Sequence, residues 1–86
     1  MKEFLEFLIK QITSKPEEIE ITENREDDTF IYHIKVSEDD MGIVIGKEGK
    51  TIKSLRNLAK AKAIRDNVRI QVLLDESLQD SNEQNP

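Results

Sequence analysis

Residue types that carry chemistry are scarce in this chain of 86 residues, which has no cysteine, no tryptophan and one histidine. The lack of cysteine excludes disulfides and thiolate metal sites, and it fits a reducing compartment. No segment approaches the roughly 20 apolar residues of a membrane span. We do not expect a signal peptide either, because Glu6 and Lys10 interrupt the first apolar stretch. These features predict a cytoplasmic protein.

Candidates for catalysis are equally few. The single histidine, His33, lies on a predicted strand close to Lys35, and we expect it in a solvated or structural role. The acidic run at 38–40 does not have the spacing of a calcium loop, and helix capping explains it better. We therefore predict that the protein is not an enzyme and that it holds no metal and no cofactor.

Charge is distributed unevenly along the chain, whose net charge is −5. Residues 46–69 contain eight basic and two acidic side chains, so this segment has a net charge of +6. Residues 1–45 have a net charge of −7, and residues 70–86 have one of −4. A local patch, not the net charge, neutralises phosphates, so the basic segment points to nucleic acid as a partner.

The hydrophobic pattern predicts six helices and strands, with one turn between the first two strands, and a single α+β domain. In successive segments, apolar residues either recur at helical spacing or alternate with polar residues at strand spacing. The predicted elements are a helix over 2–13, a strand around 19–21, a turn over 24–28, a strand over 29–36, a short helix over 39–45, a helix over 50–66 and a strand over 68–74. Such a chain most simply forms one three-stranded sheet with all three helices on one face. The last strand follows a helix pair, so it can join in parallel and make the sheet mixed.

The end of the chain differs in composition from the rest. Residues 75–86 contain four acidic residues and one apolar residue, Leu78. We therefore predict a folded domain over 1–74 and a disordered acidic tail over 75–86.

The segment 43–52 carries the clearest functional signal. Its apolar start is followed by Gly46 and Gly49, and a basic amphipathic helix pattern begins at once. Glycine has no Cβ, so the backbone can turn sharply here and come close to a ligand. The next helix offers free N–H groups and the positive end of its dipole, and both suit a phosphate.

A helix, the sequence Ile-Gly-Lys-Glu-Gly and a second basic helix together resemble the KH domain, with the match over 44–52. The extra helix and strand at the N-terminal side are those of the type II, bacterial KH fold. In its length and in the approach to the loop at 40–47, the chain is similar to the small single-KH proteins of the KhpA family. The resemblance covers 1–74 and implies a type II KH fold.

KH domains clamp about four unpaired nucleotides at the GxxG loop, so the resemblance implies binding to single-stranded RNA. Lys47 would contact phosphate, Gly42 would leave room for a base, and Glu48 would repel phosphate. The residues expected at the RNA are Gly42, Ile43, Ile45, Gly46, Lys47, Glu48, Gly49, Lys50, Lys53 and Arg56. No aromatic residue occurs after position 36, so we expect weak binding with little sequence preference. If two to four phosphates are neutralised, log K should fall against log salt with a slope of about −1.4 to −2.8.

A protein-interaction module is the alternative interpretation. Leu58, Ala61 and Ile64 lie beside the apolar stripe of the long helix and would form a dimer face, unless Ile64 closes the core. Proteins of the KhpA family self-associate and pair with a larger KH protein of the KhpB (Jag) type, which is linked to RNA binding and to cell elongation and division. The resemblance thus implies a homodimer or a heterodimer of this kind. We predict an RNA chaperone or post-transcriptional regulator, with an adaptor for another KH protein as the alternative.

Overall fold

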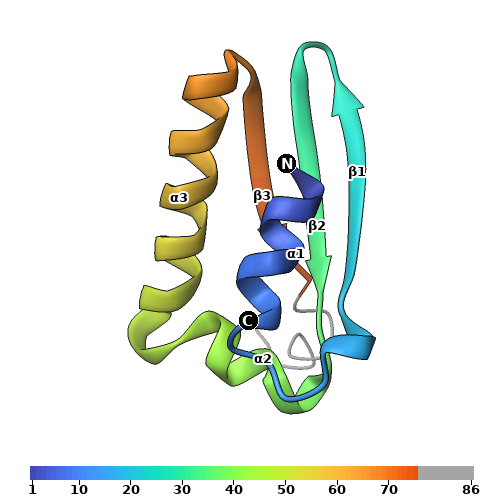
Figure 1. Ribbon diagram of the computed structural model, residues 1–86, viewed down its shortest axis with the longest axis vertical. Helices are drawn as coiled ribbons and strands as arrows, with labels where there is room; N and C mark the ends of the chain where they lie inside the picture. Colours follow the sequence, from blue (N-terminus) through green and yellow to red (C-terminus); the bar gives the residue numbers. More distant parts are fainter. Residues whose placement is uncertain (76–86) are drawn as a thin grey trace, which may run out of the picture.

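The computed structural model describes residues 1–75, and it confirms the predicted order of helix, strand, strand, helix, helix, strand (Figure 1). The elements are α1 (Lys2–Lys10), η1 (Pro16–Glu18), β1 (Glu20–Glu26), β2 (Thr29–Lys35), α2 (Glu38–Ile45), η2 (Lys47–Gly49), α3 (Lys50–Asp66) and β3 (Arg69–Leu74), where η marks a 3₁₀ turn. Asp75 donates its N–H to the carbonyl of Ile34 at 2.7 Å. The rest of the predicted acidic tail lies outside the described residues.

The strands of the described chain form one mixed sheet in the order β1-β2-β3. β1 and β2 are antiparallel, with Ile21 opposite Ile34, and Asp27 in the turn between them has a φ of 56°. β3 is parallel to β2, with Val72 opposite Tyr32. The predicted α+β class and mixed sheet are therefore confirmed. β1 and β3 form the two edges of the sheet, and α3 runs beside β3 (Figure 1).

One face of the sheet carries the core, and all three helices pack on it (Figure 1). Alternate residues of β2 explain this arrangement, because Tyr32 and Ile34 are buried whereas His33 and Lys35 are exposed. The buried residues of the core are Leu5, Ile9, Ile21, Tyr32, Ile34, Val36, Met41, Val44, Ile52, Leu55, Ala59, Val72 and Leu74. Helices and strands thus share one apolar layer between them.

Two element bounds differ by more than one residue from those that the sequence predicts. The first helix ends at Lys10 and not at residue 13, because the N–H groups of Gln11 and Ile12 donate to carbonyls only three residues back, those of Leu8 and Ile9. The polar stretch 24–28 predicts a turn, yet β1 continues to Glu26 and the turn is confined to Asp27 and Asp28. All the β1 side chains after Ile21 are exposed, so pairing with β2, and not burial of one face, holds this part of the strand.

A buried carboxylate fixes the start of α2 to the segment that follows α1. Asp40 is 3% exposed and accepts hydrogen bonds from the main-chain N–H groups of Ser14 and Lys15, both at 2.9 Å. The Ser14 hydroxyl donates a further bond at 2.8 Å. The main-chain bond from Ser14 lowers the pKa of Asp40 below its ordinary value, against an opposing effect of burial. These bonds set the place of α2 and hence of the turn after it.

Within residues 1–75, no helix is long and apolar enough to cross a membrane. The same part of the chain has no cluster of three or more His, Cys, Asp or Glu side chains arranged to hold a metal ion.

Candidate nucleic-acid interface

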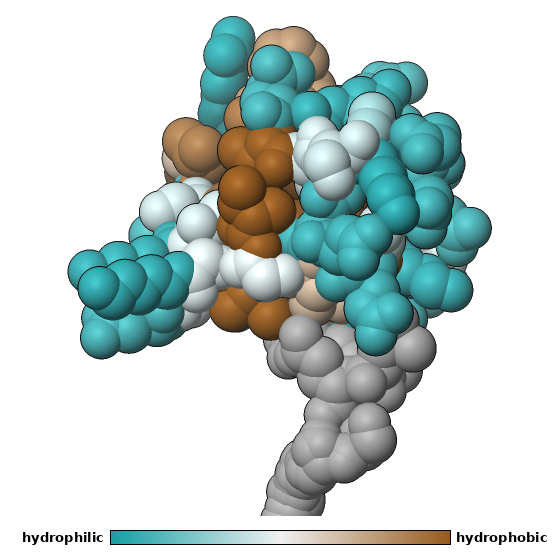
Figure 2. Space-filling model, turned by 90° about the horizontal axis from the view of Figure 1, so that it is seen from below, coloured by the Kyte–Doolittle hydropathy of each residue, from teal (hydrophilic) through white to brown (hydrophobic). Residues whose placement is uncertain are grey.

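α2 presents both open space and apolar surface next to the GxxG turn. No atom outside the helix's own backbone and its chain neighbours lies within 4 Å of the place where a Cβ on Gly42 would stand. Ile43 is 52% exposed, whereas Ile45 is partly buried and packs against the core. Seen from the end of the molecule where α2 lies, the surface shows a hydrophobic band beside a hydrophilic projection (Figure 2). A base stacked beside Gly42 and Ile43 would meet little steric hindrance.

The GxxG turn joins α2 to α3 through backbone that has a positive φ at three of its four residues. Gly46 has a φ of 80°, Glu48 one of 57° and Gly49 one of 75°. Residues with a Cβ rarely adopt such values, which explains the glycine at each end of the tetrapeptide. The N–H groups of Gly46 and Gly49 donate to the carbonyls of Gly42 at 2.8 Å and of Gly46 at 3.0 Å. The turn is thus closed by its own main chain, and its two central residues project outward.

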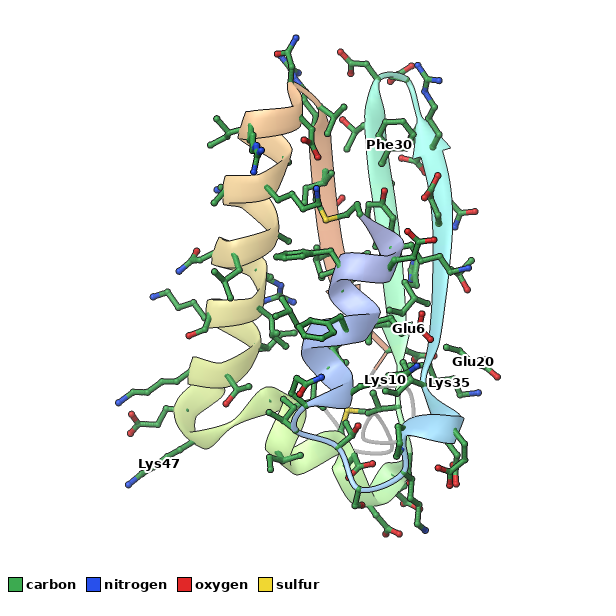
Figure 3. The ribbon with its side chains drawn as sticks, in the orientation of Figure 1. Glu6, Lys10, Glu20, Phe30, Lys35 and Lys47 are labelled. Carbon is green, nitrogen blue, oxygen red and sulfur yellow. The ribbon has the colours of Figure 1, made fainter. Side chains whose placement is uncertain are left out.

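Lys47 and Glu48 are the central residues of the turn, and both are exposed. The Lys47 side chain points away from the body of the molecule (Figure 3). The Glu48 carboxylate lies 3.9 Å from the ammonium of Lys50, and these two side chains are 71% and 75% exposed. An exposed pair of this kind is worth little in water. The turn therefore carries both signs of charge, and the lysines on either side of Glu48 must supply the attraction for an anion.

α3 starts directly after the turn and has no side chain to cap it. Its N-cap residue is Gly49, which makes no side-chain hydrogen bond, and the N–H of Lys50 donates to the carbonyl of Lys47. The following N–H groups of a helix have no acceptor within the helix itself. Main-chain donors, the positive end of the helix dipole and the ammonium groups of Lys47 and Lys50 therefore coincide at this point. That combination suits a phosphate group.

A groove of about 380 Å³ lies between α3 and the free edge of β3. It is lined by Lys53, Arg56, Asn57, Lys60, Ile70, Gln71, Val72 and Leu73. Arg56 reaches across it, and its Nε donates to the carbonyl oxygen of Val72 at 3.0 Å. The N–H and C=O of one strand residue point to the same side, so the main chain of Val72 faces the groove and not β2. A base in the groove would meet main-chain donors and acceptors together with a fixed guanidinium.

Most of the predicted RNA residues lie in the turn, on the exposed part of α2 or along the groove, whereas Ile45 packs against the core. Sequence reasoning missed the β3 wall of the groove and, on α3, Asn57 and Lys60. The recurrence of Lys53, Asn57 and Lys60 at helical spacing would have predicted one polar face. The β3 wall carries no such signal, because the sequence does not state which sheet edge stays open.

The residues of the predicted dimer face are all exposed, but the structure divides them between two grooves. Leu58 is 49% exposed and, with Ala61 and Phe4, lines a groove of about 410 Å³ between α1 and α3. Ile64 is 73% exposed and faces the β3 side instead. Its exposure decides between the two interpretations left open by the sequence, because Ile64 does not close the core.

Comparison with known proteins finds the same family in a family model and in several individual relatives. Residues 2–74 match the family model of the KhpA/KhpB KH domain. The RNA-binding protein KhpA of Chlamydia trachomatis is 46% identical over 70 residues, which cover 81% of this chain and 90% of that protein. The RNA-binding proteins KhpA of Clostridium perfringens (40% over 72 residues; 84% and 96% covered) and Thermotoga maritima (48% over 61 residues; 71% and 81% covered) are similar too. No solved structure matches the chain significantly.

Proposed function

The chain belongs to the KhpA/KhpB KH-domain family, and on that premise we propose that it binds single-stranded RNA without catalysing a reaction. One observation carries the proposal. The positive φ angles of Gly46, Glu48 and Gly49 expose Lys47 immediately before an uncapped helix start. The relatives named above are RNA-binding proteins by name, which supports this reading of the turn.

In the proposed complex, the RNA backbone lies on the turn and the bases lie along the adjoining surfaces. Lys47 and Lys50 contact phosphates, and the first-turn N–H groups of α3 donate hydrogen bonds to a phosphate oxygen. Bases lie beside Gly42 and Ile43 and continue into the groove between α3 and β3. Lys53 and Arg56 line that groove and contact the RNA there.

The chemistry of this surface predicts weak contacts with little sequence selection. None of the residues that line the groove between α3 and β3 is aromatic, so rings do not stack on bases there. Binding would rest on phosphate neutralisation, with a salt slope of about −1.4 to −2.8. Such binding suits an RNA chaperone or post-transcriptional regulator of the cytoplasm, and a role in cell elongation and division is part of this proposal.

A double substitution in the turn tests the clamp. Lys47→Asp with Glu48→Asp reverses the charge that faces the phosphate while keeping both glycines. We expect binding of a fluorescent oligouridylate to fall by at least about tenfold, with an unchanged circular dichroism spectrum. Lys10→Asp on α1 alters the net charge equally, and its side chain is half exposed. Binding by the double variant at the level of Lys10→Asp would show that the clamp is wrong.

A second function, as an adaptor, is favoured by the exposed apolar groove between α1 and α3. We propose that Leu58, Ala61 and Phe4 form a contact with a second copy or with a KhpB-type KH protein. Two clamps joined in this way would gain affinity for one RNA strand through effective concentration. Leu58→Asp should then yield a monomer by light scattering, with Lys10→Gln, which lowers the net charge by the same single unit, as the charge control. An unchanged mass for Leu58→Asp, at concentrations where the wild type is a dimer, would count against this face.

A further inference from the structure

The groove beside β3 does not end at the residues assigned to the clamp. It shares Lys60 and Ile70 with a second hollow of about 390 Å³, which also contains Val68 and Arg69. A third hollow shares Val68 and Arg69 with the second and reaches Phe30. The three hollows form one track along α3 and β3. Lys47 and Phe30 lie near its opposite ends (Figure 3).

Basic side chains line this track along its whole length. Lys53, Arg56 and Lys60 line the first hollow, and Lys60 and Arg69 line the second. Among residues 1–75, no acidic side chain lines either of these two hollows. An acidic residue, Asp28, enters only in the third, where Arg25 is also present. This charge pattern favours a polyanion as the occupant.

The far end of the track also offers apolar side chains that are exposed to solvent. Ile64 is 73% exposed and Val68 is 38% exposed. Phe30 is partly buried, and the Arg25 guanidinium lies 5.3 Å from the centroid of its ring. Apolar side chains beside cations match a nucleotide, which presents a base and a phosphate together. A free phosphate would use only the cations.

We propose that Phe30, Lys60, Ile64, Val68 and Arg69 form a distal subsite for nucleotides that continue the RNA strand beyond the four held at the turn. The proposal rests on the proposed function, because the occupant is the same strand. Lys60 and Arg69 bind its phosphates, and its bases lie against Ile64 and Val68. The rise from Lys50 to Ile64 along α3 is about 21 Å, so the turn and the subsite are well separated.

Length-dependent binding tests the subsite. The probes are fluorescent oligouridylates of four and of about ten nucleotides, the shorter matching the clamp. Arg69→Gln should lower the affinity for the longer probe by roughly threefold to tenfold and make its salt slope shallower by about 0.7. The affinity for the tetramer should stay within about twofold. Lys35→Gln is the charge control, because Lys35 has the same charge, is exposed on β2 and lines none of the three hollows.

The outcomes separate this proposal from the one it rests on. Binding of the tetramer by the wild type, with equal losses for both probes in Arg69→Gln, would keep the clamp and overturn the subsite. The same holds if Arg69→Gln and Lys35→Gln behave alike with the longer probe. No binding of either probe by the wild type would overturn both proposals. If Ile64→Ser lowers the oligomeric mass and leaves both affinities unchanged, the occupant is a second copy and the subsite is wrong.

Discussion

Thr51 occupies the space that a side chain on Gly46 would need. A Cβ built on Gly46 would stand 2.6 Å from the Cβ of Thr51 and 2.7 Å from its main-chain nitrogen, and it would overlap the Thr51 hydroxyl oxygen. Gly46 also has a φ of 80° and a ψ of 169°, a region open essentially to glycine alone. Glycine is therefore required here for two independent reasons.

Gly46→Ala should destabilise the protein by about 2–4 kcal/mol, since both backbone strain and the overlap with Thr51 oppose it. Urea unfolding followed by circular dichroism measures this loss. Gly49→Ala is the control, because Gly49 has a similar φ of 75° but no atom near its Cβ position. It should cost only about 1–2 kcal/mol. Equal losses in the two variants would show that the contact with Thr51 does not matter.

Gly42→Ala should have opposite effects on stability and on binding. Nothing crowds a Cβ at this position inside α2, so alanine should stabilise the fold by about 0.5–1 kcal/mol. The methyl group would occupy the proposed space for a base and weaken RNA binding roughly fivefold, which corresponds to about 1 kcal/mol. Urea unfolding and fluorescence anisotropy measure the two effects. Unchanged RNA affinity in a stabilised variant would remove Gly42 from the interface.

Glu48→Lys should strengthen RNA binding at low salt by roughly threefold to tenfold and steepen the salt slope by about 0.7, because one repelling carboxylate becomes a phosphate contact. Anisotropy titrations at several salt concentrations measure both quantities. Glu18→Lys changes the net charge equally on the exposed η1 turn. If Glu18→Lys has the same effect, the gain reflects net charge and not the position of residue 48.

The buried Asp40 predicts that stability depends on acid pH. Hydrogen bonds from Ser14 and Lys15 hold its pKa below the ordinary value of 3.8, so its contribution is fully present above that value. The contribution is lost as the pH falls through the lowered pKa. Asp40→Asn should therefore lower the urea midpoint strongly at pH 7, and the gap to the wild type should narrow in acid.

The exposed neighbour Asp39 supplies the control for this pH dependence. Its carboxylate is 67% exposed and pairs with Lys15 at 2.7 Å, so Asp39→Asn should change the midpoint much less. A gap between wild type and Asp40→Asn that stays constant from pH 7 into acid would show that the charge of Asp40 is not what stabilises the link to α1.

The sequence predicts the fold well where periodicity reflects burial. The alternation through Tyr32 and Ile34 and the helical spacing of Leu55 and Ala59 correspond to the buried core. Prediction is wrong for the second half of β1, where every side chain is exposed and pairing with β2 alone makes the strand. Such an edge strand gives no hydrophobic pattern to detect.

The same limit applies to the candidate site. The GxxG turn is visible in the sequence because glycine is needed for its backbone angles. The groove wall from Ile70 to Leu73 depends on β3 being an edge strand, and strand order is a property of the whole sheet. The bond from Arg56 to Val72 likewise joins segments that only the fold brings together.

The strand order also places acidic and basic side chains at opposite edges of the sheet. Because β2 lies in the middle, β1 with Glu20, Glu23 and Glu26 forms one edge, and the cations of α3 lie beside the other. A polyanion that approaches the β1 edge is repelled, whereas one that approaches the α3 edge is drawn in. A single domain would therefore hold its nucleic acid on one flank only, and enclosing a strand from both sides would require a second domain.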